Sequence, residues 1–181
     1  MKIILTAGIP IKNARSVQEK NKENFLRFER GEILIIDWDL KKPKFSTVSY
    51  VSPPGQRNPA VMFKGGEIKD GKLNVVTNSE IIIYDIKTWD ILKTITHCHF
   101  NDLHGVMEKD NHFWLVNTGL EMVQVVTADE QIIAEYNLTE TPTWERFDRS
   151  VDFRFIGSTK PHFVHVNHVF EVKSKIYAIF M

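Results

Sequence analysis

The feature that most constrains the fold of this chain is a repeated segment in which a glutamate precedes a short apolar strand. The repeat occurs at residues 31–37, 79–85 and 120–126, so that Glu32, Glu80 and Glu121 are 48 and then 41 residues apart. Before each of the last two copies lies a turn followed by a second apolar run, at 70–78 and 110–118. Repeats of roughly 40–45 residues with four short strands each are typical of β-propeller blades. The sequence therefore predicts an all-β fold of propeller blades, each with four antiparallel strands.

Composition restricts the class of protein and its partners. The 181 residues are 43% hydrophobic and 25% charged, as in an ordinary globular domain. Lys plus Arg and Asp plus Glu both number 23, so no excess of positive charge predicts nucleic acid or an anionic membrane as a partner. No apolar run reaches the roughly 18 residues of a transmembrane helix. The single cysteine, Cys98, excludes an intramolecular disulfide and favours a reducing compartment, which predicts a cytoplasmic protein.

The strands are predicted from alternating apolar residues between turn-forming residues. They cover residues 2–6, 32–38, 44–51, 60–68, 72–77, 80–86, 91–97, 103–108, 112–117, 121–127 and 131–136, with a last pair that starts at 166 and ends at 176–180. Asp70-Gly71, Asp110-Asn111 and Asp129-Glu130 are the predicted turns. A single propeller-type domain over 1–181 is interrupted by irregular insertions at about 9–30 and 138–164. A capping-box pattern in the first predicts a short helix at 17–29, and the aromatic residues of the second are expected to pack.

The predicted strands group as about three, four, four and two, which makes three to three and a half blades. The smallest propellers have about four blades, and a propeller closes by pairing its first and last strands. The chain is therefore expected to be a partial propeller, or half of a ring that a second copy completes. The second alternative predicts a homodimer.

Two groups of polar residues occupy matching positions at the starts of first strands. Asp102 and His104 begin one predicted blade, and His165, Asn167 and His168 begin the next. The first strands of propeller blades line the central channel, so we expect His104 and His168 to meet at one mouth of it. Neutral imidazoles can hold a divalent transition metal or serve as general acid and base, and Asp102 could orient His104. His104, His168 and Asp102 are thus the candidate catalytic residues, with His104 and His168 as candidate metal ligands.

Other residues near these strand starts are candidates for binding a ligand. Lys64 holds a comparable early position in the preceding blade, where its charge could bind an anionic group. His165 and Asn167 share a face of their strand, and Asn117 precedes a turn that could face a ligand. Alternatively, the channel histidines are polar plugs that bond to the backbone, Asp102 caps a turn and Asn117 forms a hairpin.

The segment His97-Cys98-His99 places a thiol between two imidazoles, which could lower the pKa of the thiol. Its spacing is not that of a zinc finger, and we expect Cys98 to point into the core. Trp144, in the second insertion, could cover a site. The sequence contains no nucleophile motif, phosphate-binding loop or dinucleotide-binding motif.

Three runs, at 101–105, 116–121 and 165–169, together resemble the motifs of an uncharacterised bacterial family of six-bladed β-propellers of the NHL, YVTN and arylsulfotransferase type. The resemblance covers residues 60–181, and full-length relatives would continue with further blades. It supplies no agreed activity. By analogy with related propellers, it implies that His104 or His168 is a metal ligand or a nucleophile.

Three functions follow as hypotheses. The first is a binding module whose channel site holds a small polar or anionic molecule. The second is a metal-dependent or histidine-dependent enzyme, such as a lyase, hydrolase or group transferase, acting at the channel mouth. The third is a scaffold protein that assembles through its sheet edges.

Overall fold

The computed structural model describes residues 2–10, 28–38, 42–51 and 62–180, which form four antiparallel sheets. The predicted all-β fold is confirmed. Sheet 1 contains β1 (Lys2–Pro10), β2 (Phe28–Asp37) and β3 (Lys44–Tyr50), and sheet 2 contains β4 (Gly66–Lys69), β5 (Lys72–Val76), β6 (Ile81–Asp85) and β7 (Ile91–Ile95). Sheet 3 contains β8 (Leu103–Lys109), β9 (His112–Asn117), β10 (Met122–Thr127) and β11 (Ile132–Asn137), and sheet 4 is the hairpin of β12 (Val166–Val172) and β13 (Lys175–Phe180). The short helical turns are η1 (Thr118–Leu120), α2 (Thr143–Arg146) and η2 (Phe153–Phe155).

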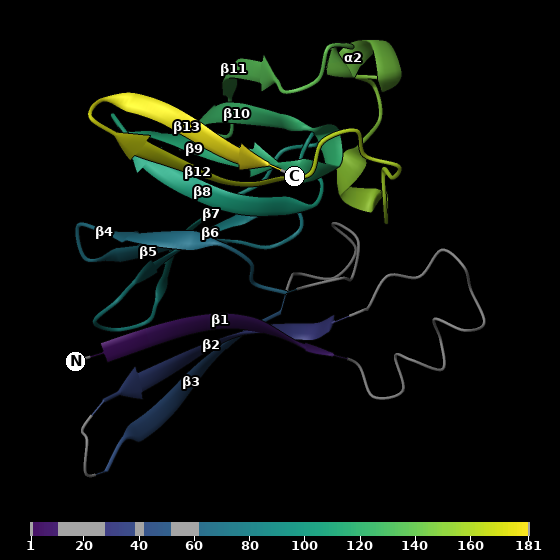
Figure 1. Ribbon diagram of the computed structural model, residues 1–181. Helices are drawn as coiled ribbons and strands as arrows, with labels where there is room; N and C mark the ends of the chain where they lie inside the picture. The colour runs from purple at the N-terminus through teal and green to yellow at the C-terminus, as the bar shows by residue number, and fades with distance from the viewer. Residues whose placement is uncertain (1, 11–27, 39–41, 52–61, 181) are drawn as a thin grey trace.

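The sheets lie against one another in chain order, as Figure 1 shows from sheet 1 at one end to sheets 3 and 4 at the other. An apolar layer fills each space between neighbouring sheets. The first layer includes Ile33, Tyr50, Phe63, Leu73 and Tyr84; the second includes Val76, Ile81, Ile95, Leu103 and Leu115; the third includes Met107, Val116, Val123, Val166 and Val169. Burial of apolar surface in these layers holds the sheets together.

Strand β6 illustrates why the sequence contains continuous apolar runs rather than simple alternation. Ile82 and Tyr84 face the layer shared with sheet 1, whereas Ile81 and Ile83 face the layer shared with sheet 3. Successive residues of a strand point to opposite faces, so a sheet covered on both sides needs apolar residues at every position.

The hairpin turns follow directly from the sequence. Asp70 and Gly71 both have positive φ angles, of 47° and 76°, and Asp110 and Asn111 have φ angles of 51° and 60°. Two central residues with positive φ make the turn that matches the twist of the flanking strands. Both predicted hairpins are therefore confirmed.

Several predicted boundaries are wrong. Strand β1 extends from Lys2 to Pro10 because it pairs with β2 along its whole length, so the first insertion is shorter than expected. Phe28 and Glu29 belong to β2 and not to the predicted helix, whose other residues lie outside the described part of the chain. Within the predicted strand 60–68, regular pairing begins only at Gly66.

Strand β7 ends at Ile95, and the next residues leave the sheet. The backbone N–H of Phe100 donates to the carbonyl of His97 at 2.9 Å, which closes a turn over 97–100. Cys98 lies half-buried in this turn, so the expectation that it points into the core is wrong.

The second insertion packs as expected. Phe153 is buried against Leu120 and Met122, and Trp144 and Phe147 lie beside it. The backbone N–H of Phe153 also donates to the carbonyl of Cys98 at 2.7 Å. Apolar contact and a backbone hydrogen bond together fix the insertion against sheet 3.

Two of the three repeated glutamates, Glu80 and Glu121, connect neighbouring parts of the chain, whereas Glu32 lies 3.4 Å from Arg30 of its own strand. Glu80, fully buried, accepts hydrogen bonds from the hydroxyls of Tyr50 in sheet 1, at 2.6 Å, and Thr77, at 3.2 Å. Glu121, also fully buried, accepts from Arg146 and from the backbone N–H of Phe163. A buried carboxylate needs such partners, which explains why the repeat carries an acid among apolar residues.

Replacing Glu121 with Ala is expected to lower the free energy of unfolding by about 3–5 kcal/mol, because it leaves Arg146 unpaired in a largely buried position. Denaturation by urea measures the change. Asp129→Ala serves as the control, since Asp129 is 92% exposed and 3.6 Å from Lys93; removing that pair should cost less than about 1 kcal/mol. Equal losses in the two variants would contradict the structural role of Glu121.

Candidate functional site

A cavity of about 550 Å³ opens where the starts of β4, β8 and β12 lie close together. The polar residues that line it are Lys64, Asn78, Asn101, Asp102, His104, Ser158, Thr159, Lys160, His162 and His165, and Phe28, Met62 and Gly157 complete the lining. The expectation that the starts of these segments converge is met for Lys64, Asp102, His104 and His165.

His104 reaches the cavity because of a β-bulge. In the pairing of β8 with β9, Leu103 lies opposite Asn117 and Gly105 opposite Val116, so His104 is an extra residue with no partner. A bulge re-aims a side chain and bends its strand. Asp102, just before it, has a φ angle of 50°, a left-handed conformation that Asp adopts more readily than most residues.

The start of β12 contains the same feature. Val166 pairs with Phe180 and His168 with Ile179, which leaves Asn167 as the extra residue. Asn167 is therefore the structural counterpart of His104, and the two side chains meet, with His104 Nδ1 3.3 Å from Asn167 Oδ1. Equivalent bulges on adjacent sheets thus bring together residues 63 positions apart.

Sheets 2 and 3 come close together at Gly65 and His104. The backbone N–H of Gly65 donates to the carbonyl of His104 at 3.0 Å, and a Cβ atom on Gly65 would lie only 2.4 Å from that oxygen. Glycine is required where two backbones come so near. The contact fixes Lys64, the next residue back, beside Asp102 and His104.

Lys64, Asp102 and His104 form a linked charged group. The Lys64 ammonium donates to the Asp102 carboxylate, and His104 Nε2 lies 3.4 Å from the same oxygen. Burial lowers the pKa of Lys64, and the charge of Asp102 opposes that change. Burial also raises the pKa of Asp102, but the hydrogen bond from His104 and the charge of Lys64 more than offset it, so the pKa of Asp102 lies below its usual range.

His162 and His165 stand beside this group. The His104 and His165 ring centroids are 4.8 Å apart, and those of His162 and His165 are 6.0 Å apart. Burial is the main cause that lowers the pKa of each of these two rings, and the charge of Lys160 adds to it. Both rings are therefore mostly neutral at pH 7 and able to accept hydrogen bonds.

His162 has an unusual environment. Its Nε2 lies 3.0 Å from the hydroxyl of Thr159, which itself donates to the carbonyl of Gly119, so Nε2 carries the proton and Nδ1 is an acceptor. Nδ1 is buried and has no hydrogen-bond partner among the described residues. A buried acceptor of this kind calls for a donor on a ligand or a bound water.

Three of the predicted residues are not among those that line this cavity: Asn167 only contacts His104, and His168 and Asn117 lie elsewhere. His168 is exposed, stacks on Phe170 at 6.0 Å and lines a separate hollow with Glu67 and Glu108. The sequence matched His168 to His104 by residue type, but the bulge places Asn167 there and turns His168 the other way. The two histidines therefore do not share a site, and a metal ion held by both has no support in this geometry.

Asn117 is the other residue that lies elsewhere. It is fully buried, its Nδ2 donates to the carbonyl of His99 and to Gln124, and its Oδ1 accepts from the backbone N–H of Leu120. These bonds use both amide protons and begin the η1 turn, in line with the alternative of a structural role.

Sequence reasoning missed the contribution of residues 157–162. They were assigned to an irregular insertion, yet Ser158, Thr159, Lys160 and His162 form one wall of the cavity. The available signal was a turn-forming run, Gly157 to Pro161, directly before a group of histidines spaced three apart.

Within the described residues, no helix is long and apolar enough to span a membrane. Comparison of the chain with the models of known protein families and with curated proteins found no significant match. The resemblance to six-bladed bacterial propellers therefore remains a prediction from three motifs.

Asp102→Asn should reduce the pH dependence of stability in acid. The pKa of Asp102 is lower in the folded chain than its unfolded value of about 3.9, so its contribution is present above about pH 4 and is lost as pH falls toward the folded value. Asn tolerates the left-handed backbone and resembles Asp in size. From about pH 5 to about pH 2, the free energy of unfolding should fall more steeply in the wild-type chain than in the variant.

Chemical denaturation at each pH measures this difference in slope. Asp85, Asp148 and Asp152 also have lowered pKa values, but they titrate in both chains and cancel from the comparison. Parallel curves for the two chains would show that Asp102 is not linked to Lys64 and His104 as described.

Proposed function

We propose that this chain is a β-propeller-type binding module whose cavity takes a small polar ligand with an anionic group. The observation that carries the proposal is a buried lysine, Lys64, on the wall of a cavity that also presents uncommitted imidazole nitrogens. Face-to-face packing of the four-stranded sheets 2 and 3 supports the propeller part of the proposal, because blades pack in this way.

The charge of the cavity favours an anion. Its lining includes two lysines, Lys64 and Lys160, and one carboxylate, Asp102. The side chain of Lys64 is only 10% exposed, and a buried cation interacts with a partner more strongly than one in water. The Lys64 ammonium has three N–H donors, of which Asp102 accepts one, so a carboxylate or phosphate group of a ligand would accept a hydrogen bond from another.

The hydrogen-bonding groups favour binding and orientation. Both ring nitrogens of His104 face acceptor oxygens, those of Asp102 and Asn167, so this ring is held in place. The ring nitrogens of His165 have no hydrogen-bond partner among the described residues, and Nδ1 of His162 is a buried acceptor. A ligand that carries hydroxyl or amide groups beside its anionic group would satisfy them.

The size and the remaining lining restrict the ligand further. A volume of about 550 Å³ lies in the range of small-molecule sites. Phe28 and Met62 supply an apolar wall on the side of sheet 1. A metabolite of moderate size, with an anionic end and a partly apolar body, fits this combination.

An acid–base enzyme is the second candidate. The observation that favours it is the ring of His165, which lines the cavity 4.8 Å from the ring of His104 and whose pKa is lowered chiefly by burial. In this reading His165, whose ring nitrogens are uncommitted, would exchange a proton with the bound molecule. The free thiol of Cys98 supports a reducing compartment such as the cytoplasm for either function.

Thermal unfolding in the presence of mono- and dicarboxylates, inorganic phosphate and phosphate monoesters tests the proposal. A ligand present at about 100 times its Kd should stabilise the wild-type chain by about 2.7 kcal/mol, which raises Tm by about 5–10 °C. His165→Ala should weaken binding about tenfold, because it removes one hydrogen bond to a charged or polar group.

His168→Ala is the matched control, because it removes a histidine from the same segment but outside the cavity. It should bind the ligand as the wild-type chain does. Lys64→Met should remove the preference for anions. The proposal fails if no compound of the panel stabilises the wild-type chain, or if His168→Ala weakens binding as much as His165→Ala.

A further inference from the structure

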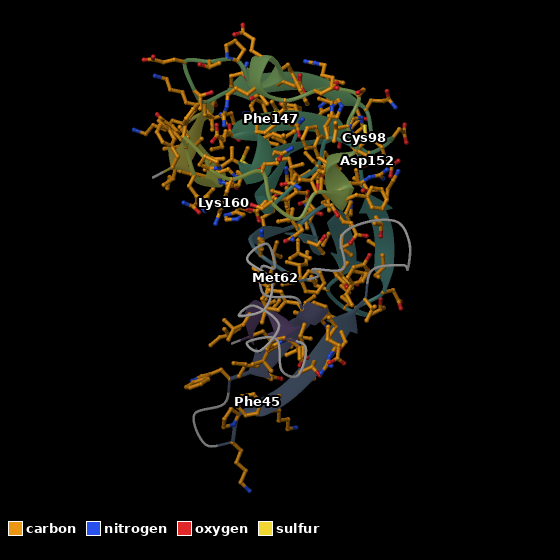
Figure 2. All side chains as sticks on the ribbon, turned by 90° about the vertical axis from the view of Figure 1, so that its right-hand side faces the viewer. Phe45, Met62, Cys98, Phe147, Asp152 and Lys160 are labelled. Atoms are coloured by element: carbon orange, nitrogen blue, oxygen red, sulfur yellow. The ribbon has the colours of Figure 1, made fainter. Side chains whose placement is uncertain are left out.

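A second group of histidines lies away from the cavity, in the turn that follows β7. His97, Cys98 and His99 each offer a ligand atom, and these three atoms all lie within 4.8 Å of one another. Among the described residues, this is the one group of three or more His, Cys, Asp or Glu side chains so arranged. In Figure 2, Cys98 lies beside Asp152, well apart from Lys160 of the ligand cavity.

The spacing of the donor atoms suits a metal ion. Cys98 Sγ lies 3.8 Å from His97 Nδ1. A zinc ion bound to nitrogen at about 2.0 Å and to sulfur at about 2.3 Å holds these two atoms about 3.5–3.8 Å apart, for angles between tetrahedral and trigonal. The turn therefore presents the sulfur and this nitrogen at a separation that one ion can bridge.

The hydrogen bonds of the two rings leave both Nδ1 atoms unprotonated, with that of His97 engaged by a backbone N–H. His99 Nε2 lies 2.9 Å from the carbonyl oxygen of Arg149, an acceptor, so Nε2 carries the proton and Nδ1 is unprotonated. An outward hydrogen bond to a carbonyl is the usual way in which a ligating histidine is oriented. His97 Nδ1 accepts from the backbone N–H of His99 at 3.1 Å, so it is also unprotonated, and a metal ion would replace that bond.

The surroundings hold the turn and leave one side open. Trp144 covers His99, with ring centroids 4.7 Å apart, and the backbone N–H of Phe153 fixes the carbonyl of Cys98. A hollow of about 510 Å³ beside the two rings is lined by His97, His99, Glu135 and Arg149. Arg149 is paired with Glu135 and Arg154 with Asp152, so the nearby cations are offset by carboxylates.

We propose that His97, Cys98 and His99 bind one Zn²⁺ ion, with the fourth coordination position open to this hollow. Imidazole and thiolate are ligands that zinc prefers, and three protein ligands with one open position describe a zinc site that can take water or a small molecule. The site shares no residue with the ligand cavity, so it stands or falls independently of the proposed function.

Protection of the thiol tests the proposal with the wild-type chain. Cys98 is the single cysteine, so the rate of alkylation by iodoacetamide, followed by mass spectrometry, reports this position alone. After treatment with a chelator and a reductant, addition of Zn²⁺ should slow alkylation by about tenfold or more, because a bound thiolate is no longer a free nucleophile. Mg²⁺, which prefers oxygen ligands, should leave the rate unchanged.

Two double variants assign the effect. His97→Ala with His99→Ala keeps the thiol but removes both imidazoles, and zinc should then give little protection. His104→Ala with His165→Ala removes histidines of the ligand cavity and should leave protection intact. Circular dichroism confirms that each variant is folded before its rate is interpreted.

Cobalt gives an independent measurement. Co²⁺ added to the wild-type chain should produce the charge-transfer absorption of a cobalt–thiolate bond, and Cys98→Ser should abolish it. The proposal is overturned if Zn²⁺ does not slow alkylation of the wild-type chain, or if the variant without His97 and His99 is protected equally well.

Discussion

The burial of sheet 2 on both faces is the constraint on which the rest of the structure depends. One face packs against sheet 1 and the other against sheet 3, and side chains of β5 and β6 alternate between the two layers. Burial in such a sheet costs a polar side chain its hydration, and Glu80 recovers hydrogen bonds from Tyr50 and Thr77. The hydroxyl of Tyr84, buried in the same sheet, has no hydrogen-bond partner among the described residues. Both candidate sites are built from segments outside regular pairing.

The ligand cavity depends on a local departure from that pairing. His104 and Asn167 are extra residues in bulges at equivalent positions of β8 and β12, and both side chains turn to the same space. Without the bulge, the side chain at the position of His104 or Asn167 would point to the opposite face of the strand, toward an apolar layer. The close contact of Gly65 with the carbonyl of His104 then brings Lys64 to the same point. Repetition of one backbone feature in successive sheets thus assembles a polar site from residues far apart in sequence.

Most of the fold could be predicted from the sequence, but the site only in part. The repeated glutamates, the Asp70-Gly71 and Asp110-Asn111 turns and the alternating runs locate the strands of sheets 2 and 3 within two residues, except for the start of β4. They do not reveal a bulge, because a bulge changes the register without a distinctive residue. The sequence pattern therefore pairs His168 with His104, although the structural counterpart of His104 is Asn167. Residues 157–162 were missed for a related reason, since an irregular segment is positioned by tertiary contacts rather than by its own pattern.

The histidines beside Cys98 and the histidine of the bulge, His104, differ in their contacts because their backbone conformations differ. In a regular strand, His97 and His99 would share one face and Cys98 would point to the other, as the sequence suggested. The turn closed by Phe100 brings all three side chains to one side, and the adjacent histidines become close enough to bind a common ion. In the bulged strand start, by contrast, the imidazole of His104 is held by Asp102 and Asn167. Both of its nitrogens are committed, so it orients its neighbours instead of offering a metal ligand. The identity of a histidine thus says little about its role until the backbone that carries it is known.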